Sequence, residues 1–455
     1  MTQSSWQKTS GPLKLRARLV KILVLTNLYP PHHAGTYDLR CQAITDALRL
    51  RGHSTLVATS NHGLNTEQRD EEVHRRLLLN GGYGHPLLTR FRELQEVEEH
   101  NNRVLHEVIA DFQPDLVHVW SLLGLSKSLI FALRNSRLPT VYDVADGWLA
   151  EELRQDPWLR WWNAPGTNLV RTSLELAGRR NHFDVTAPTR MVKGLDRIPE
   201  VYGPPKFLAN VQPDSISSFR FDRLYFCSRA LKQTTEQAGF RVSHGEIIHP
   251  GIPAQHFVGE VKPPSTPVKK LLIVSPLDEP SGVMTAAQAL LHLRQNNAQA
   301  TLSIYGRGES DYISQLRSFV VQNSLPVEFL TVSNQNRDLA AIYRQHDALL
   351  YTAEWEEPFA TVPLEAMACG LPVIGALIGG GRELFRHGEN ALSYTPGDPL
   401  ELAARIQELQ MQPVLRRQMA ETAQAEVQSK YNETTVVDFT QPSDPQTLRT
   451  PPKSR

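Results

Sequence analysis

The sequence predicts two α/β domains, each built on a doubly wound parallel sheet, that face each other across a cleft. Short apolar runs rich in branched side chains alternate with helical patterns along most of the 455 residues. A proline-rich stretch without apolar periodicity, residues 261–270, interrupts the alternation, which then begins again. Because consecutive parallel strands need a long crossover between them, this alternation favours one parallel sheet on each side of the linker.

The first domain is predicted to span residues 21–260, after an N-terminal tail at 1–20. Its opening run "KILVLTN" is short, apolar and rich in branched side chains, which predicts a strand. The loop "YPPHHAG" and the helical pattern "DLRCQAITDALRLRGH" follow, and "STLVATS" after Gly52 completes a βαβ unit. Further strands are predicted at 114–120, 139–145, 222–228 and 245–251.

The second domain is predicted at residues 271–412, beyond the linker at 261–270. Its strand candidates are 271–277, 300–306, 327–332, 348–353 and 371–376. A helix at 413–437 is expected to pack back toward the first domain, and the polar end at 438–455 is predicted to be disordered. Ligands bind at the carboxyl ends of the strands in such sheets, so the loops after the strands and the cleft between the domains are the expected site.

The composition narrows the classes of function. The chain has 40% apolar and 21% charged residues, as soluble globular proteins do, and 48 basic side chains balance 48 acidic ones. No overall positive field therefore indicates a nucleic-acid partner. Cys41, Cys227 and Cys369 are too few and too far apart for a disulfide framework or a zinc site, which favours a reducing cytoplasm. No segment predicts a membrane span.

The segment "EPFATVPLEAMACGLPVIG", followed by "IGGGRELFRHGENAL" and "PGDPLELAARI", resembles the donor-binding half of glycosyltransferase family 4. Weaker similarities occur at "YPPHHAGTYDLRCQAITDALRLRGH", "PDLVHVW", "DRLYFCSRALK", "IIHPGIP" and "IYGRGE". The resemblance implies the GT-B fold, in which two Rossmann-like domains face each other across a cleft. It also implies a retaining enzyme that uses a nucleotide diphosphate sugar.

The resemblance implies a role for each of two glutamates in this segment. Glu365 is expected to accept hydrogen bonds from both ribose hydroxyls, within a helix that starts near Phe359. Glu357 is the expected catalytic carboxylate, which contacts the donor sugar or stabilises positive charge at its anomeric carbon. The amide groups of Phe359, Ala360 and Thr361 would bind the diphosphate. Without the resemblance, a helix cap for Glu357 and a solvated helical position for Glu365 would be the simpler explanation.

The expected donor site departs from the family at its basic pair. Relatives place an arginine and a lysine after the first strand of the second domain, whereas this chain has Pro276 and Ser281 within "SPLDEPSGV". Each missing cation removes a charge-assisted hydrogen bond worth about 1.5–3 kcal/mol. Arg307 and Arg382 are the candidates to replace them, and a surface charge is the alternative for each. The other residues expected at this loop are Ser275 and Gly282.

Three residues of the first domain are candidates for the same cleft. Gly35 in "HHAGTY" would let the backbone approach a donor phosphate, with a simple turn as the alternative. Ala145 replaces the family's histidine after the strand "TVYDVA", and Asp146 with Trp148 fits a subtype of the family. Asp146 would act in catalysis by binding a sugar hydroxyl or accepting the acceptor's proton, or it would cap the next helix. Trp148 would contact the acceptor.

The sequence thus predicts a retaining, metal-independent cytoplasmic glycosyltransferase that needs no cofactor besides its nucleotide sugar. The acceptor would be a glycan, a lipid-linked molecule or a small molecule, and a lipid-linked acceptor would bring the first domain to the inner face of the membrane. Two alternatives stay open. One is a non-catalytic GT-B protein that binds a sugar nucleotide or a glycan, and the other is a structural subunit of a glycan-assembly complex that binds no nucleotide.

Overall fold

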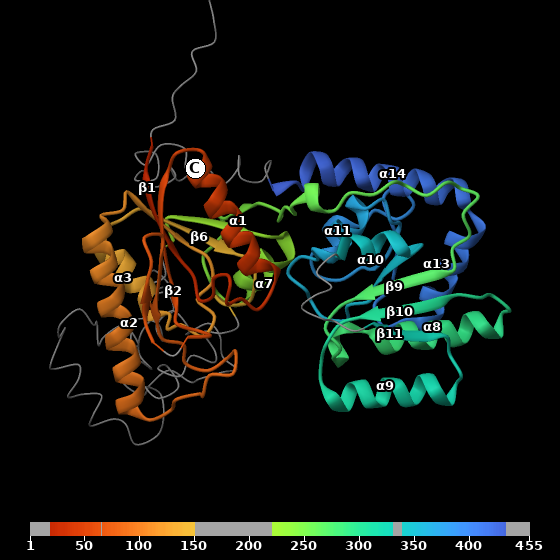
Figure 1. Ribbon diagram of the computed structural model, residues 1–455, viewed down its shortest axis with the longest axis horizontal. Coiled ribbons are helices and arrows are strands. Elements are labelled where there is room, and N and C mark those ends of the chain that lie inside the picture. The colour runs from red at the N-terminus through yellow and green to blue at the C-terminus, as the bar shows by residue number, and fades with distance from the viewer. Residues whose placement is uncertain (1–18, 65, 151–220, 331–338, 434–455) are drawn as a thin grey trace, which may run out of the picture.

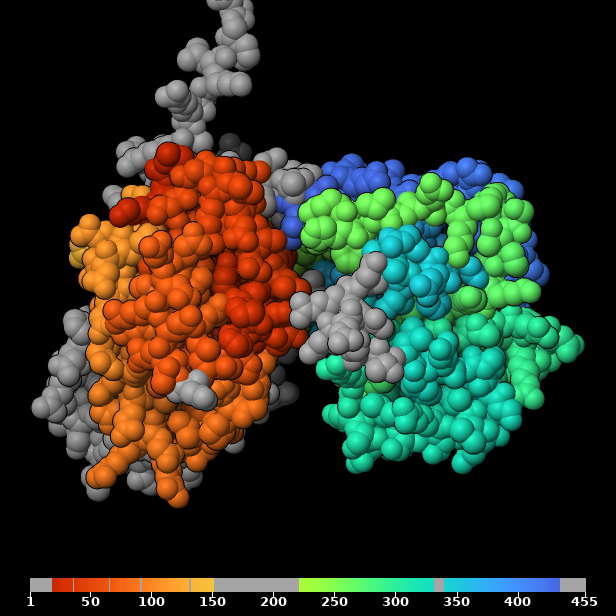
Figure 2. All heavy atoms as spheres, viewed as in Figure 1, coloured from red at the N-terminus to blue at the C-terminus, as the bar shows by residue number. Residues whose placement is uncertain are grey.

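The computed structural model describes residues 19–64, 66–150, 221–330 and 339–433, which form two α/β domains side by side (Figure 1). Nearly all of the predicted N-terminal tail and the whole predicted disordered end at 438–455 lie outside the described residues. In the space-filling view the two domains touch in their upper halves and are separated by an open groove below (Figure 2).

The N-terminal domain is built on a sheet of strand order β3-β4-β2-β1-β5-β6-β7-β8, in which only β3 and β4 pair antiparallel. The strands are β1 (Lys21–Leu25), β2 (Ser54–Ser60), β3 (Gln68–Arg69), β4 (Val73–Leu77), β5 (Leu116–Val119), β6 (Thr140–Val144), β7 (Arg223–Phe226) and β8 (Glu246–Ile247). The helices are α1 (Thr36–Leu50), α2 (Phe91–Phe112), α3 (Ser128–Ser136) and α7 (Arg229–Gln237). The strand predicted at 245–251 is only two residues long, because Pro250 has no amide group to continue the ladder.

The C-terminal domain is built on a parallel sheet of order β11-β10-β9-β12-β13-β14. Numbered within the domain, this is the order 3-2-1-4-5-6 of a Rossmann-type doubly wound sheet. The strands are β9 (Lys270–Val274), β10 (Thr301–Tyr305), β11 (Val327–Leu330), β12 (Ala348–Tyr351), β13 (Val373–Ala376) and β14 (Leu392–Tyr394). The helices are α8 (Val283–Gln295), α9 (Ser310–Gln322), α10 (Leu339–Gln345), α11 (Val362–Ala368), α12 (Gly381–Leu384), α13 (Pro399–Met411) and α14 (Pro413–Lys430). Its strands are largely buried because helices cover both faces of the sheet (Figure 1).

Two places in the C-terminal domain show how the sequence sets a helix start. The side chain of Asp398 accepts hydrogen bonds from the amides of Leu400 and Glu401 and so caps α13. Helix α11 begins at Val362, with Pro363 in its first turn, rather than near Phe359 as predicted. Proline suits the first turn of a helix, since its missing amide needs no partner there.

Among the described residues, two segments lead from one domain toward the other. The connecting segment, residues 251–257, leads from β8 toward β9, and α14 runs along the upper edge of the C-terminal domain back toward the N-terminal domain (Figure 1). After α14 the amide of Glu433 donates to the carbonyl oxygen of Ile252 at 3.0 Å, and the amide of Ile252 donates to that of Tyr431 at 2.9 Å. The end of the described chain is therefore tied to the connecting segment.

Each sheet has one point at which the strand order reverses. In the C-terminal sheet this point lies between β9 and β12, and in the N-terminal sheet it lies between β1 and β5. Loops diverge at such a point and leave a crevice at the carboxyl ends of the two strands. The fold thus predicts a binding site after Val274 and Tyr351, before any side-chain chemistry is considered.

Candidate functional site

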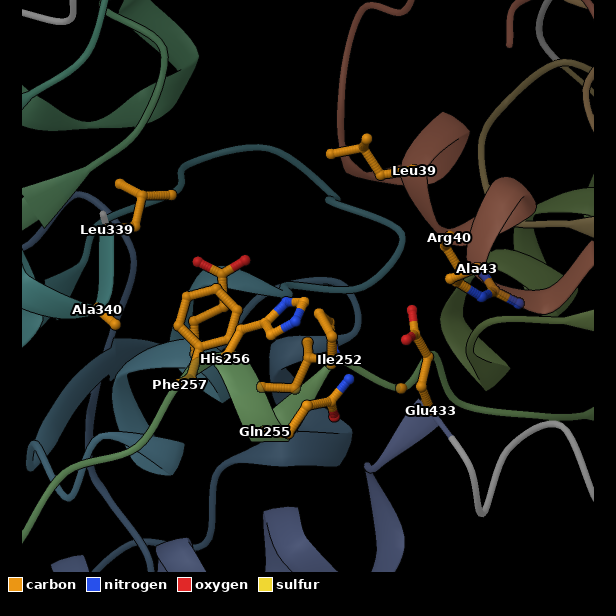
Figure 3. Close-up of a pocket in the computed structure, with 13 residues that line it drawn as sticks. Leu39, Arg40, Ala43, Ile252, Gln255, His256, Phe257, Leu339, Ala340 and Glu433 are labelled. Atoms are coloured by element: carbon orange, nitrogen blue, oxygen red, sulfur yellow. The ribbon is translucent and has the colours of Figure 1, made fainter. Parts of the chain in front are cut away.

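Two cavities lie on either side of the start of α11. The first, which we call the strand-end cavity, has a volume of about 640 Å³ and is lined at the carboxyl ends of β9, β10 and β12 by residues that include Ser275, Arg307, Tyr351, Trp355 and Glu357. The second, the inter-domain cavity, has a volume of about 810 Å³. Its walls come from α1, the connecting segment, α10 and α11, as well as from Glu433 (Figure 3). Both volumes suit a drug-sized ligand.

Glu357 belongs to the strand-end cavity. The hydroxyl group of Tyr351, at the end of β12, donates a hydrogen bond to Oε2 of Glu357. Burial raises the pKa of Glu357 above its ordinary value, and the hydrogen bond from Tyr351 opposes part of that rise. The cavity thus holds a carboxylate fixed by a strand residue, next to space for a ligand.

Glu365 belongs to the inter-domain cavity. It lies in the first turn of α11 with only 8% of its surface exposed, and the hydroxyl group of Tyr343 in α10 donates to its Oε2 at 2.7 Å. Burial raises the pKa of Glu365 to about 7, and the hydrogen bond from Tyr343 acts in the opposite direction. A buried carboxylate that keeps one oxygen free of that bond can accept further hydrogen bonds from a ligand.

The residues between the two glutamates connect the cavities. Val362 lines the strand-end cavity and Glu365 the inter-domain cavity, although both are in α11. Among the described residues, the amides of Phe359, Ala360 and Thr361 donate no backbone hydrogen bond. The ring of Phe359 stacks on His249 of the N-terminal domain, so its side chain packs between the domains.

The two arginines proposed to replace the basic pair have different surroundings. Arg382 is half exposed and forms a two-bond ion pair with Glu356, with Nη1 to Oε2 and Nη2 to Oε1 both at 2.8 Å. Arg307 lines the strand-end cavity. The pairing of Arg382 leaves Arg307 as the arginine lining that cavity within the described residues.

The loop after β9 is held by hydrogen bonds between its own residues. The carboxylate of Asp278 accepts hydrogen bonds from both the amide and the hydroxyl of Ser281. Ser275 and Pro276 line the strand-end cavity. Gly282 has a positive φ of 65°, and a Cβ there would lie 2.0 Å from the carbonyl oxygen of Thr352, so this glycine is required for α8 to start against the end of β12.

The predicted residues of the N-terminal domain are engaged within that domain. Oδ1 of Asp146 accepts from the amide of Trp148 at 2.9 Å, and Oδ2 accepts from the hydroxyl of Ser121 at 3.2 Å. Trp148 is fully buried, so its ring packs in the core rather than facing the cleft as expected for an acceptor contact. The amide of Gly35 donates to the carboxylate of Asp38 at 3.3 Å. Any phosphate near Gly35 would therefore meet the negative charge of Asp38.

One residue that lines the inter-domain cavity, Arg40, forms an ion pair that the sequence did not reveal. Nη2 of Arg40 in α1 lies 2.7 Å from Oδ2 of Asp143 in β6, with both side chains buried. The guanidinium group lies over the rings of Tyr37 and Trp120, at 5.8 and 5.1 Å from their centroids. Arg40 reaches the cavity opposite the connecting segment (Figure 3). The two partners are 103 positions apart in the sequence, which explains why no local motif marks this pair.

Metal-ligand clusters and membrane-spanning helices are both absent from the described residues. No group of three or more histidine, cysteine, aspartate or glutamate side chains there is arranged to hold a metal ion. No described helix combines the length and the apolar character needed to cross a bilayer.

Residues 260–426 match the model of the family Glycosyl transferases group 1. The match covers the C-terminal domain, both glutamates and the lining of the strand-end cavity. The glycogen synthase of Mycobacterium tuberculosis is 31% identical over 222 residues, which are 48% of this chain and 53% of that protein. The spore coat protein SA of Bacillus subtilis is 25% identical over 170 residues, 36% of this chain and 45% of that protein. The chain spans about half the length of the curated relatives it matches.

Solved structures confirm the predicted fold. Anabaena Alr3699/HepE in complex with UDP is similar with a TM-score of 0.60 and 20% identity, over 92% of this chain and 98% of that chain. Sucrose-phosphate synthase from Thermosynechococcus elongatus is similar with a TM-score of 0.64 and 17% identity, over 93% and 97% of the two chains. The chain thus has the two-domain GT-B fold. Assignment to family 4 stays a prediction.

Proposed function

We propose that this protein is a retaining glycosyltransferase that moves a sugar from a nucleotide diphosphate sugar to a hydroxyl acceptor. The observation that carries the proposal is a pair of carboxylates in adjacent cavities, the buried Glu365 and the partly buried Glu357. A donor whose ribose contacts Glu365 and whose sugar reaches Glu357 has its diphosphate at the start of α11, between the two cavities. The family match of residues 260–426 and the solved complexes of similar fold with UDP support this proposal.

The proposed mechanism is a front-face substitution. The carboxylate of Glu357, held by Tyr351, stabilises the positive charge that develops at the anomeric carbon. An oxygen of the leaving diphosphate assists deprotonation of the acceptor hydroxyl. Asp146 lies after β6 at the carboxyl edge of the N-terminal sheet, where it would bind the acceptor. No step is assigned to a metal ion or to a cofactor.

The strand-end cavity suits a neutral sugar. Trp355 is 46% exposed and lines the cavity beside Glu357, and the face of a tryptophan ring packs well on a sugar ring. Ser275, Ser281 and Thr352 also line it. Their hydroxyl groups already donate hydrogen bonds within the protein, and each can still accept one from a sugar hydroxyl. We therefore infer a hexose donor and a hydroxyl acceptor such as a glycan, a lipid-linked molecule or a small molecule.

We place the reaction in the cytoplasm, and at the inner face of the membrane if the acceptor is linked to a lipid. Cys41, Cys227 and Cys369 are free and buried, which supports a reducing compartment.

Two assays on the purified protein test the proposal. UDP or GDP should raise the melting temperature, since a ligand at 100 times its dissociation constant stabilises the folded state by about 2.7 kcal/mol. The corresponding nucleotide sugars should then be turned over, either by transfer to an acceptor or by slow hydrolysis. Absence of any thermal shift across the nucleotide panel contradicts the proposal.

A second candidate function is favoured by one observation. The loop after β9 has Pro276 and Ser281 at the two positions where relatives carry cations, it adds the carboxylates of Asp278 and Glu279, and Arg382 is bound by Glu356. A non-catalytic protein that binds a sugar nucleotide or glycan could keep such a loop, because it need not stabilise a leaving group. Thermal stabilisation by a nucleotide without any turnover of its sugar derivatives would favour this candidate.

Substitution of the two arginines should separate their roles. We expect Arg307→Ala to weaken nucleotide diphosphate binding about tenfold, because a charge-assisted hydrogen bond in the strand-end cavity is lost. Arg382→Ala should change the affinity by less than about twofold, because this arginine is exposed and already paired. Calorimetric titration of both variants with UDP and GDP measures the difference. A larger loss in Arg382→Ala than in Arg307→Ala would contradict the assignment.

A further inference from the structure

His249 lies at the contact between the two domains. Its ring stacks on that of Phe359, with centroids 4.9 Å apart and planes at 27°. Its Nδ1 lies 3.0 Å from the carbonyl oxygen of Cys227, and its Nε2 lies 3.8 Å from Oε2 of Glu383 in α12. The other oxygen of Glu383 accepts from the amide of Ala230 at 3.1 Å, in the first turn of α7. One carboxylate of the C-terminal domain thus meets both a histidine and a helix start of the N-terminal domain.

One protonation state of His249 suits both of its neighbours. A carbonyl oxygen only accepts hydrogen bonds, so Nδ1 beside Cys227 must carry a proton. In the neutral ring, Nε2 then turns a lone pair toward Oε2 of Glu383, which has no hydrogen-bond partner among the described residues. The imidazolium form carries a proton on both nitrogens and attracts that carboxylate.

The other groups around the ring do not offset this attraction. Tyr431, after α14, lies with its centroid 6.0 Å from that of His249, and burial raises its pKa, so it stays neutral. Behind it, Arg386 and Glu426 form an ion pair at 2.6 Å that is neutral as a unit. Burial also raises the pKa of the Cys227 thiol, which therefore carries no charge. Glu383 is then the charged group that faces the ring directly.

Helix α12 connects this contact to Glu357. The amide of Gly380, just before α12, donates to the carbonyl oxygen of Glu357 at 2.9 Å. Gly379 has a φ of 50°, and a Cβ there would lie 2.1 Å from the same oxygen, so the two main chains are tightly packed. Phe359, on which His249 stacks, follows Glu357 by two residues. The N-terminal domain therefore reaches the loop 357–359 through α12 and through the Phe359 ring.

We infer that His249 is a positioning residue for the proposed reaction. As an imidazolium ion, it binds Glu383 and supports Phe359, and so it fixes the loop that carries Glu357 while the domains are in contact. The catalytic consequence rests on the proposed function, whereas the contact between the domains does not.

Three variants and two matched controls test the effect on turnover. His249→Asn keeps a donor for Cys227 but none for Glu383, and Glu383→Gln removes the charge. Each should lower kcat about 10- to 100-fold with little change in the KM for the donor, because the catalytic carboxylate is misplaced rather than removed. The double variant should be no slower than the slower single variant. The matched controls, His292→Asn and Glu389→Gln on the exposed surface, should leave kcat unchanged.

His249→Gln adds a test of the donor at Nε2. Its side-chain amide places one N–H donor near the position of Nε2. We therefore expect His249→Gln to retain more of the wild-type kcat than His249→Asn, which lacks a donor there. Full activity of the single variants, or losses that multiply in the double variant, would overturn the inference.

Thermal unfolding without substrates tests the contact itself. The wild type should melt at a higher temperature than Glu383→Gln, because the variant loses the carboxylate that faces His249. In the His249→Asn background, Glu383→Gln should lower the melting temperature by less than it does in the wild type. Additive shifts would contradict the contact. Since this readout needs no turnover, failure of the proposed function and failure of this inference are distinguishable.

Discussion

Replacing Glu357 by glutamine is expected to lower kcat for sugar transfer by about 10²- to 10³-fold. The amide has nearly the shape of the carboxylate and can still accept a hydrogen bond from Tyr351. What it lacks is the negative charge that would stabilise an oxocarbenium-like transition state, so the loss should appear in kcat more than in the KM for the donor. Steady-state rates with a nucleotide sugar that the wild type uses would measure it.

Two further variants make this result specific. Tyr351→Phe removes the hydrogen bond to Glu357 but keeps the carboxylate, so its effect should be smaller, about tenfold. It should also move the pH dependence of turnover upward, because that hydrogen bond opposes the rise of the Glu357 pKa. Glu408→Gln serves as the control, since Glu408 is a partly buried carboxylate paired with Arg405 and lines neither cavity. Unchanged turnover of Glu357→Gln would remove Glu357 from the mechanism.

The sequence was sufficient for the fold because its signals are local. Apolar runs of strand length alternate with helical patterns, and this alternation gave the parallel sheets on both sides of residues 261–270. The order of the strands was not contained in that pattern. It decides that the crevice lies after Val274 and Tyr351, and no local signal marks it.

Only the part of the candidate site that lies in one sequence segment could be predicted. Glu357 and Glu365 stand in one conspicuous segment, but their hydroxyl partners Tyr351 and Tyr343 come from a strand and another helix. Helix α11 begins between the two glutamates, so their side chains line different cavities. The spacing of the glutamates in the sequence did not predict this separation.

Burial explains why the prediction for Trp148 was wrong. Trp148 was assigned to the acceptor by its place after a strand, yet it is enclosed in the core, and exposure is a property of packing rather than of sequence position. The partner of a charged side chain is equally hard to predict from sequence. The motif indicates where the Cα atom of Arg382 lies, but it does not show that Glu356 binds the guanidinium group of Arg382.

Replacing Glu365 by glutamine is expected to stabilise the free protein at alkaline pH. The pKa of Glu365 is about 7 in the folded protein against an ordinary value of 4.5, so between these values the folded state holds a proton that the unfolded chain releases. The free energy of unfolding of the wild type therefore falls as pH rises through this window. At pH 8 the cost is at most about 3.5 kcal/mol, since each pKa unit corresponds to about 1.4 kcal/mol. The neutral variant avoids it.

Denaturant unfolding at two pH values measures this effect. At pH 8 Glu365→Gln should be more stable than the wild type by about 1–3 kcal/mol. At pH 4.5 the two proteins should differ little, because the wild-type carboxyl is then largely protonated and Tyr343 can donate to either side chain. A variant that is less stable at pH 8 would show that the ionised carboxylate is held by interactions that stabilise the fold.

The same substitution should weaken nucleotide binding. Ribose hydroxyls donate to an ionised carboxylate more strongly than to an amide, so the affinity of the wild type for UDP or GDP should rise between pH 6 and 8. Glu365→Gln should bind about 10- to 100-fold more weakly at pH 8, with little dependence on pH. A 2′,3′-dideoxy nucleotide, which lacks both hydroxyls, is the control and should bind the two proteins equally. A carboxylate that lowers stability and raises affinity is one retained for its ligand, because packing alone would favour the glutamine.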